Sequence, residues 1–257
     1  MIPVAGTPAY CVLTTKVAGD MRPGVGEEAW ARVAPLPWHW VRQVHGAAVL
    51  MVPPAGRDEA RSSGPPANGI VAANGLLGDN ASVGARARVA ANIAGANGVV
   101  TADGIVAAEP TLRLAMFAAD CALVGMASPE GVIGIAHCGW RGLVAGIIEE
   151  VAAEMRRAGA SSIAAVRGPC IGPECYEFGV VELGLIERRH GPAVRSVTAG
   201  GALSLDLPAG VRMAAAAGGI TSLVEVSLCT ACDHRWFSFR ARHDRGRHAM
   251  VVTGSLR

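Results

Sequence analysis

Three short apolar segments in the middle of the chain constrain the fold more than any other feature. They are LRLAMFAA (112–119), CALVGMA (121–127) and GVIGIAH (131–137), and turn residues separate them. Apolar runs of this length between turn residues are typical of buried strands. The same reasoning predicts further strands over residues 10–15, 38–44, 47–52, 162–168, 203–207, 221–227 and 248–254.

A helical pattern follows the third segment. Apolar residues recur at near-helical spacing from Leu143 to Met155, an arginine pair follows, and Gly159 comes just beyond it. Cations in the last turn and a glycine after it are typical of a helix C-terminus. Further helices are predicted near residues 79–95, 178–190 and 208–217.

Strand and helix patterns together predict an α+β fold with mixed β-sheets flanked by helices. We find no internal repeat and no linker that clearly divides the chain, so we expect a single domain over residues 1–257. Residues 53–69 (PPAGRDEARSSGPPANG) are rich in Pro, Gly and Ser, which predicts an exposed loop.

Composition excludes several classes of protein. The net charge is only +2, whereas a nucleic-acid-binding protein normally carries a stronger basic bias. No apolar run approaches the roughly 20 residues that a membrane span needs, and the N-terminus lacks the pattern of a secretory signal. Seven cysteines, an odd number, indicate reduced thiols and a cytoplasmic location.

Three metal-binding side chains lie at the ends of predicted strands. His45 lies at the end of a predicted strand, in the segment RQVHG; Cys121 lies in an Asp-Cys corner, and His137 ends the strand GVIGIAH. If the two strands beside the turn at 128–131 pair in antiparallel fashion, Cys121 and His137 lie side by side. Catalytic zinc usually has three protein ligands. Each residue alone has an ordinary alternative as a packed or surface side chain, and Cys138 should face the opposite side of its strand.

Two further cysteine-containing segments carry weaker signals. Cys229 and Cys232 have the C-x-x-C spacing of a zinc or redox site, but no second C-x-x-C completes a set of four ligands. Cys170 and Cys175 lie in a Gly/Pro turn, GPCIGPECYEFG, where they either pack or line a pocket.

The segment GWRG has the features of an anion-binding turn. A strand passes through Gly139 and Gly142 into a helix, whose first N–H groups are unpaired, and Arg141 adds a planar guanidinium. Trp140 could stack on a planar ring. The alternative is structural, with Arg141 in a salt bridge and Trp140 filling a gap in the core.

Six motifs occur in the same order as in a known family. They are RQVHG, TADGIV, ADC, HCGWRG, GPCIGPECYEFG and LCTACDHRWFSFR followed by GR. From about Tyr10 to Val252 the chain resembles the YfiH-type family, also called multicopper polyphenol oxidoreductase (laccase domain) and peptidoglycan editing factor. Members of that family are regarded as purine nucleoside phosphorylases with adenosine deaminase and methylthioadenosine phosphorylase activity.

The resemblance implies one zinc ion bound by His45, Cys121 and His137. This chain departs from the family pattern beside ADC. The family usually has Thr before the motif and Pro two residues after it, whereas this chain has Ala and Leu123 at those places. The family's segments before QVHG are also poorly matched, which bears on substrate preference.

Purine nucleosides and phosphate are therefore the expected substrates. A metal that lowers the pKa of its water to about 7 would supply the hydroxide for deamination at the purine C6. For phosphorolysis, Arg141, the helix N-terminus and Arg42 would hold phosphate. Asp103 or Asp120 would exchange the proton with the base, and Gln43 and Trp140 complete the expected substrate-binding set.

Three other functions are weighed against this one. A multicopper oxidase needs many histidines, largely in His-x-His pairs, and this chain has seven histidines and no such pair. A cysteine hydrolase would use Cys121 as a nucleophile activated by His137, acting on a peptidoglycan precursor. A zinc-stabilised binding module would have no catalytic activity. The oligomeric state stays open.

Overall fold

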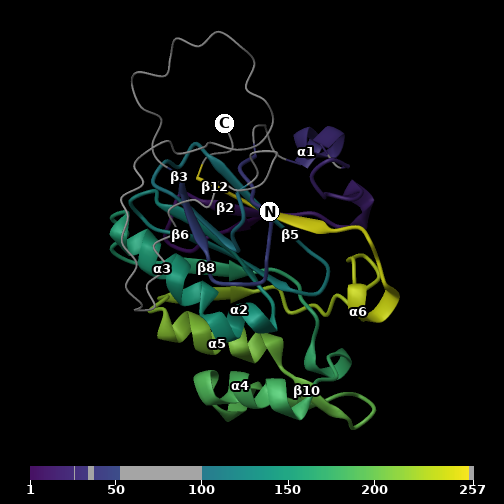
Figure 1. Ribbon diagram of the computed structural model, residues 1–257. Helices are drawn as coiled ribbons and strands as arrows, with labels where there is room; N and C mark the ends of the chain where they lie inside the picture. Colours follow the sequence, from purple (N-terminus) through teal and green to yellow (C-terminus); the bar gives the residue numbers. More distant parts are fainter. Residues whose placement is uncertain (26, 34–37, 53–99, 255–257) are drawn as a thin grey trace.

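The computed structural model describes residues 1–25, 27–33, 38–52 and 100–254. These residues form mixed and antiparallel β-sheets with several helices, which confirms the predicted α+β class (Figure 1). The loop predicted at 53–69 and the helix predicted at 79–95 lie outside the described residues.

A six-stranded mixed sheet has the order β11-β8-β6-β7-β4-β3. Its centre is antiparallel, with β6 paired to β7 and to β8, and β4 paired to β7; β11 with β8 and β3 with β4 are parallel. The strands are β3 (Val49–Val52), β4 (Gly104–Ala107), β6 (Ala122–Ala127), β7 (Ile133–Cys138), β8 (Ala164–Arg167) and β11 (Ser222–Glu225).

A second sheet of four antiparallel strands packs on the first. Its order is β1-β2-β12-β5, so β12 (His248–Thr253) pairs with both β2 (Tyr10–Leu13) and β5 (Arg113–Ala118), and β1 (Ile2–Pro3) forms the edge. One apolar core lies between the sheets. A Cβ at Gly125 would lie 2.5 Å from the Cys11 Sγ, so glycine permits the close approach of β6 to β2.

Helices cover the other face of the six-stranded sheet. They are α2 (Trp140–Ala145), α3 (Ile147–Arg157) and α5 (Leu207–Ala217), with α4 (Val180–His190) packed outside them (Figure 1). The predicted helix after residue 143 is confirmed, but it is divided. Gly146 takes a left-handed conformation, φ 83°, that ends α2 and precedes α3.

The outer face of the four-stranded sheet carries a small aromatic core. Trp30, from α1 (Glu27–Val33), stacks on Trp38 with ring centroids 4.9 Å apart, and Phe117 of β5 lies beneath them.

The other elements are β9 (Arg195–Val197), β10 (Leu203–Leu205), α6 (Phe239–Arg242) and 3-10 turns η1 (Lys16–Ala18), η2 (Pro173–Cys175) and η3 (Pro192–Val194). Among the described residues, no helix combines the length and apolar character needed to cross a bilayer.

The strand predicted at 38–44 is wrong. This segment makes only isolated bridges, from His39 to Leu114 and from Arg42 to Thr101. Its backbone hydrogen bonds go first to β5 and then to the residues before β4, so it crosses between the two sheets and cannot form a continuous ladder with either. Strand β4, in contrast, has no counterpart among the predicted strands, because GIVA is too short to be distinguished from its surroundings.

Candidate functional site

His45, Cys121 and His137 meet at one point. Their ligand atoms all lie within 4.8 Å of one another, and the two imidazole rings are nearly perpendicular with centroids 4.8 Å apart. The antiparallel pairing predicted for the two strands is confirmed, since Leu123 of β6 lies opposite His137 of β7 and Cys121 comes just before β6.

Asp103 holds both histidines in place. Its fully buried carboxylate accepts hydrogen bonds from the backbone N–H groups of Val44 (3.1 Å), His45 (2.9 Å) and Gly46 (2.6 Å). These bonds stabilise the turn in which His45 has a φ of 60°. The same carboxylate lies 3.1 Å from the His137 Nδ1, which leaves Nε2 as the ring nitrogen available to a ligand.

Asp120 positions Cys121 through a strained turn. Its φ of 97° is rare for a residue with a side chain, and hydrogen bonds hold it there. The Thr230 hydroxyl donates to Oδ1 (2.7 Å), the Arg240 backbone N–H donates to Oδ2 (2.6 Å), and the Ile171 N–H donates to the Asp120 carbonyl (2.9 Å). Asp103 and Asp120 thus both act as positioning residues, and a role for either in proton transfer stays a prediction.

The electrostatics of the cluster favour a bound cation. Burial alone would raise the pKa of the Cys121 thiol, but the neighbouring charge of His137 and hydrogen bonds from His137 and His45 outweigh burial and lower that pKa. Burial likewise opposes the charged form of His137, while Cys121 and Asp103 raise its pKa. A thiolate and two imidazoles within reach of one point are the donor set that zinc prefers. The residues present therefore fit a zinc ion.

Gly139 makes room for the Cys121 sulfur. A Cβ built at residue 139 would lie only 2.8 Å from that Sγ, closer than real contacts allow. We expect Gly139→Ala to push the sulfur out of position and to lower zinc affinity about tenfold or more, the scale of other changes that misorient a ligand. Competition with a chelating dye would measure this. Gly142→Ala, whose Cβ would meet the Ile147 side chain at 3.2 Å, is the control, and equal zinc affinities in the two variants would contradict the assignment.

A pocket of about 680 Å³ opens over the three residues. Four aromatic side chains and four arginines contribute to its walls, a composition suited to a planar, partly anionic ligand. Those eight residues are Arg22, Trp40, Arg42, Phe117, Tyr176, Phe239, Arg240 and Arg247. Of the residues predicted for substrate binding, Arg42, Gln43 and Asp120 line the pocket. The Gln43 amide is committed to the backbone of Phe117, to which it donates at 2.8 Å and from which it accepts at 3.0 Å.

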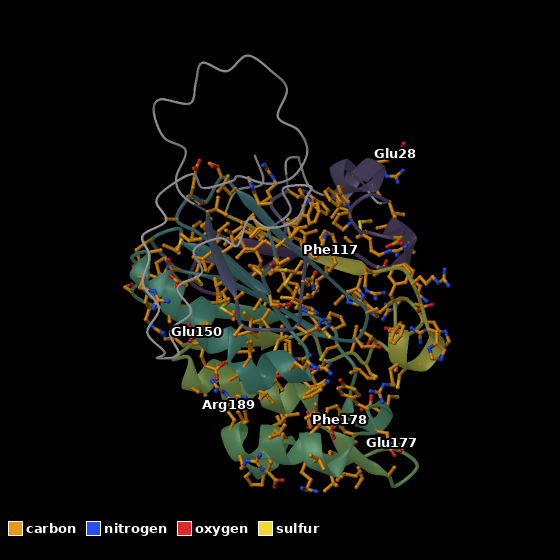
Figure 2. The ribbon with its side chains drawn as sticks, in the orientation of Figure 1. Glu28, Phe117, Glu150, Glu177, Phe178 and Arg189 are labelled. Carbon is orange, nitrogen blue, oxygen red and sulfur yellow. The ribbon has the colours of Figure 1, made fainter. Side chains whose placement is uncertain are left out.

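Trp140 and Arg141 are not among the described residues that line this pocket. Trp140 packs edge-to-face on Phe178, and the Arg141 guanidinium carbon lies 4.3 Å from the centroid of the Trp140 ring. Figure 2 shows Phe178 near β10, well apart from Phe117, which lines the pocket. The charge of Arg141 nevertheless acts on Tyr176, which lines the pocket. The GWRG turn therefore lies behind this wall of the pocket, and a role for Trp140 and Arg141 in substrate binding stays a prediction.

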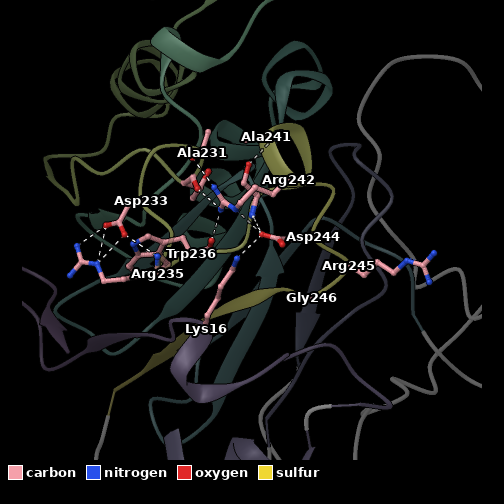
Figure 3. Close-up of polar contacts among 12 residues, drawn as sticks. Lys16, Ala231, Asp233, Arg235, Trp236, Ala241, Arg242, Asp244, Arg245 and Gly246 are labelled. Carbon is pink, nitrogen blue, oxygen red and sulfur yellow. Dashed lines mark hydrogen bonds and ion pairs between the residues drawn. The ribbon is translucent and has the colours of Figure 1, made fainter.

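The basic segment near the C-terminus supplies two of those arginines. Within it, the Arg242 guanidinium donates to the carbonyls of Thr230 (2.9 Å), Ala231 (2.7 Å) and Trp236 (2.7 Å) (Figure 3). This network leads the chain past the site, so that Arg240 and Arg247 reach the pocket. The segment RWFSFRARHDRGRH was visible in the sequence as a charge cluster, but nothing in it indicated which arginines face a ligand.

A protein-family model matches most of the chain. The model described as multi-copper polyphenol oxidoreductase laccase matches residues 26–254. The chain belongs to this family. Its structure is similar to that of YlmD from Geobacillus stearothermophilus, with a TM-score of 0.72 and 26% identity over 98% of this chain and 93% of that one.

Two relatives of the family have names that describe an activity. A protein from Xylella fastidiosa named purine nucleoside phosphorylase is 33% identical over 83% of this chain and 71% of its own length. A protein from an unknown prokaryotic organism, named adenosine deaminase RL5, is 33% identical over 54% of this chain and 56% of its own length. Both names indicate enzymes that act on purine nucleosides.

Proposed function

We propose that this protein is a zinc-dependent purine nucleoside phosphorylase, which converts a purine nucleoside and phosphate to the free base and ribose 1-phosphate. One observation carries the proposal: a two-histidine, one-cysteine cluster lies in a pocket whose walls combine aromatic rings with arginines. The names of the relatives in the family support the same substrate class.

Zinc fits the cluster better than a set of copper ions. All seven histidines of the chain are described, and among the described residues only His45 and His137 belong to a group that could hold a metal. A trinuclear copper cluster and a blue-copper site need many more histidine ligands than two. When bound, zinc would supply a Lewis acid in the floor of the pocket. Asp103 and Asp120 would keep its ligands oriented.

The pocket walls account for the two substrates. Phe239, whose side chain is exposed, offers an apolar face to a purine ring, and the arginines offer charge-assisted hydrogen bonds to phosphate. In the proposed reaction a phosphate oxygen bonds to the ribose C1′, the C1′–N9 bond breaks, and the purine leaves with the bonding electrons and gains a proton. The arginines would hold phosphate on the face of the ribose opposite the departing base.

We expect Arg240→Ala to weaken phosphate binding ten- to a hundredfold, because one charged hydrogen bond contributes about 1.5–3 kcal/mol. Arg141→Ala, a change outside the pocket lining, should leave the KM for phosphate within about twofold of wild type. Initial rates at varied phosphate measure both values. The sequence favoured Arg141 as the phosphate ligand, so the opposite ranking of the two variants would restore that assignment.

Chromatography of the products formed from adenosine, with and without phosphate, tests the proposed activity. Adenine that appears only with phosphate is the expected result. Inosine in both buffers would instead make deamination the main reaction, as the name of one relative suggests. If neither adenine nor inosine forms, both proposed activities are refuted.

A cysteine hydrolase is the second candidate, because the lowered pKa of Cys121 and the nearby His137 also suit a nucleophile and its base. Removal of zinc with a chelator separates the two. The phosphorylase should lose activity and recover it when zinc is restored, whereas a hydrolase acting on a peptidoglycan precursor should be indifferent to chelation.

A further inference from the structure

A second group of metal-binding side chains lies in a different part of the molecule. Glu174, Cys175, Cys229 and Cys232 have ligand atoms that all lie within 4.8 Å of one another. The Cys175 and Cys232 sulfurs are 3.3 Å apart, and the Cys232 sulfur is 3.6 Å from the Glu174 Oε1. The C-x-x-C pair that was incomplete in the sequence thus gains a third sulfur and a carboxylate from a turn more than fifty residues away.

Backbone contacts hold the two turns together. Cys170 and Cys229 form a parallel bridge, and the Thr230 N–H donates to the Cys170 carbonyl at 3.1 Å. The Gly172 N–H donates to the Cys229 sulfur at 3.2 Å. This N–H group favours the thiolate but does not outweigh burial, which raises the pKa of the Cys229 thiol to about 11 without a metal. N–H···S bonds of this kind commonly orient metal ligands. The arrangement is therefore fixed by the fold around it as well as by the four side chains.

We propose that Glu174, Cys175, Cys229 and Cys232 bind a second zinc ion, separate from the site at His45, Cys121 and His137. Three sulfurs and one carboxylate oxygen complete a tetrahedral shell, which is the usual geometry of a structural zinc site. With Zn–S bonds of about 2.3 Å, tetrahedral sulfurs lie about 3.8 Å apart. The separations here require shifts of only a few tenths of an ångström to one ångström.

A disulfide between Cys175 and Cys232 accounts for less of the arrangement. It would use two of the four groups and leave both the Cys229 sulfur and the Glu174 carboxylate beside it without a role. The group is also accessible to an ion from solvent. Cys232 is exposed, and a cavity of about 240 Å³ is lined by Glu174 and Cys229.

The site would stabilise one wall of the substrate pocket. Tyr176, next to Cys175, lines the pocket, and so do Phe239 and Arg240, which follow Cys232 in the chain. The Arg240 guanidinium already bridges the two segments: it donates to the Glu177 carbonyl at 3.0 Å and lies 4.9 Å from the Tyr176 ring centroid. A zinc ion would join the same two segments through their side chains.

Metal stoichiometry tests the proposal. The full-length protein is stripped of metal under a non-chelating reductant, reloaded with zinc or Co²⁺, and assayed by elemental analysis. We expect Cys232→Ser to bind one ion fewer than wild type and Cys121→Ala to retain the second ion. The Co²⁺ form of Cys121→Ala should keep an intense thiolate-to-metal charge-transfer band that Cys232→Ser has lost. This comparison stands even if the first site binds no metal and the proposed activity fails.

Two further measurements complete the design. Glu174→Gln should lower the affinity for the second ion. Glu177 is an exposed neighbour outside the group, so Glu177→Gln should leave that affinity unchanged. Circular dichroism checks that each variant is folded, which the exposed position of Cys232 favours. Equal stoichiometry in wild type and Cys232→Ser would overturn the proposal. A Cys175–Cys232 disulfide recovered by mass spectrometry from protein purified without reductant would also overturn it.

Discussion

Cys121→Ala is expected to lower the rate of adenine formation from adenosine and phosphate by about three orders of magnitude. The substitution deletes one of three ligands in the candidate metal site, and the charge stabilisation that a metal supplies amounts to several kcal/mol. A loss of about 4 kcal/mol in transition-state stabilisation corresponds to a thousandfold lower rate. Initial rates at saturating phosphate, together with the zinc content of the same preparation, measure the effect.

Cys138→Ala is the matched control. Cys138 is adjacent to His137 in the strand, but its fully buried side chain belongs to the core beneath the helices, as predicted from the alternation along a strand. The control should lose some stability, by about 1 kcal/mol, and retain activity and zinc. Substantial phosphorolysis by Cys121→Ala would rule out a role for this cluster in the reaction.

Asp103→Asn is expected to lower the free energy of unfolding by about 3 kcal/mol and the zinc affinity by ten- to a hundredfold. The carboxylate is fully buried and accepts three backbone N–H groups in addition to the His137 ring. In the Asn side chain an NH2 group replaces one carboxylate oxygen, and this NH2 group cannot accept the hydrogen bonds that the backbone N–H groups donate. Each hydrogen bond to a charged group contributes about 1.5–3 kcal/mol. Loss of a residue that orients a ligand weakens metal binding on the stated scale.

Urea unfolding of the metal-free protein separates the stability effect from the metal effect. Asp206→Asn serves as the control, because Asp206 is also a carboxylate that accepts a backbone N–H, at the N-terminus of α5 and away from the cluster. It should change the free energy of unfolding by less than about 1 kcal/mol, because Asn and Asp cap helices about equally well, and leave zinc affinity unchanged. Wild-type zinc affinity in Asp103→Asn would mean that the histidines do not depend on this carboxylate.

Strands of both sheets could be predicted from local sequence. The three apolar segments between residues 112 and 137 became β5, β6 and β7, and the turn between the last two placed Cys121 beside His137. This succeeded because consecutive antiparallel strands joined by a short turn have their pairing determined by nearby residues. His45 was also a candidate from its place at a strand end, but local sequence did not place it beside the other two residues, because its position depends on contacts with a distant residue, Asp103.

The parts that local sequence did not predict depend on contacts between distant segments. The 38–44 segment (WHWVRQV) is rich in aromatic and β-branched residues like a strand, yet its hydrogen bonds are divided between β5 and the residues before β4. Arg240 and Arg247 reach the pocket only because Asp120, Thr230 and Arg242 route the chain there. The Cys175–Cys232 contact joins turns that no periodicity connects.

The place of β12 in its sheet has a consequence for folding during synthesis. This strand lies between β2 and β5, so each of these strands lacks a partner on the edge that faces β12 until residues 248–253 have left the ribosome. Arg247, directly before it, completes the pocket at the same time. The nascent chain therefore carries these two strand edges unpaired until β12 has been made, and sheet closure and pocket assembly occur as one step.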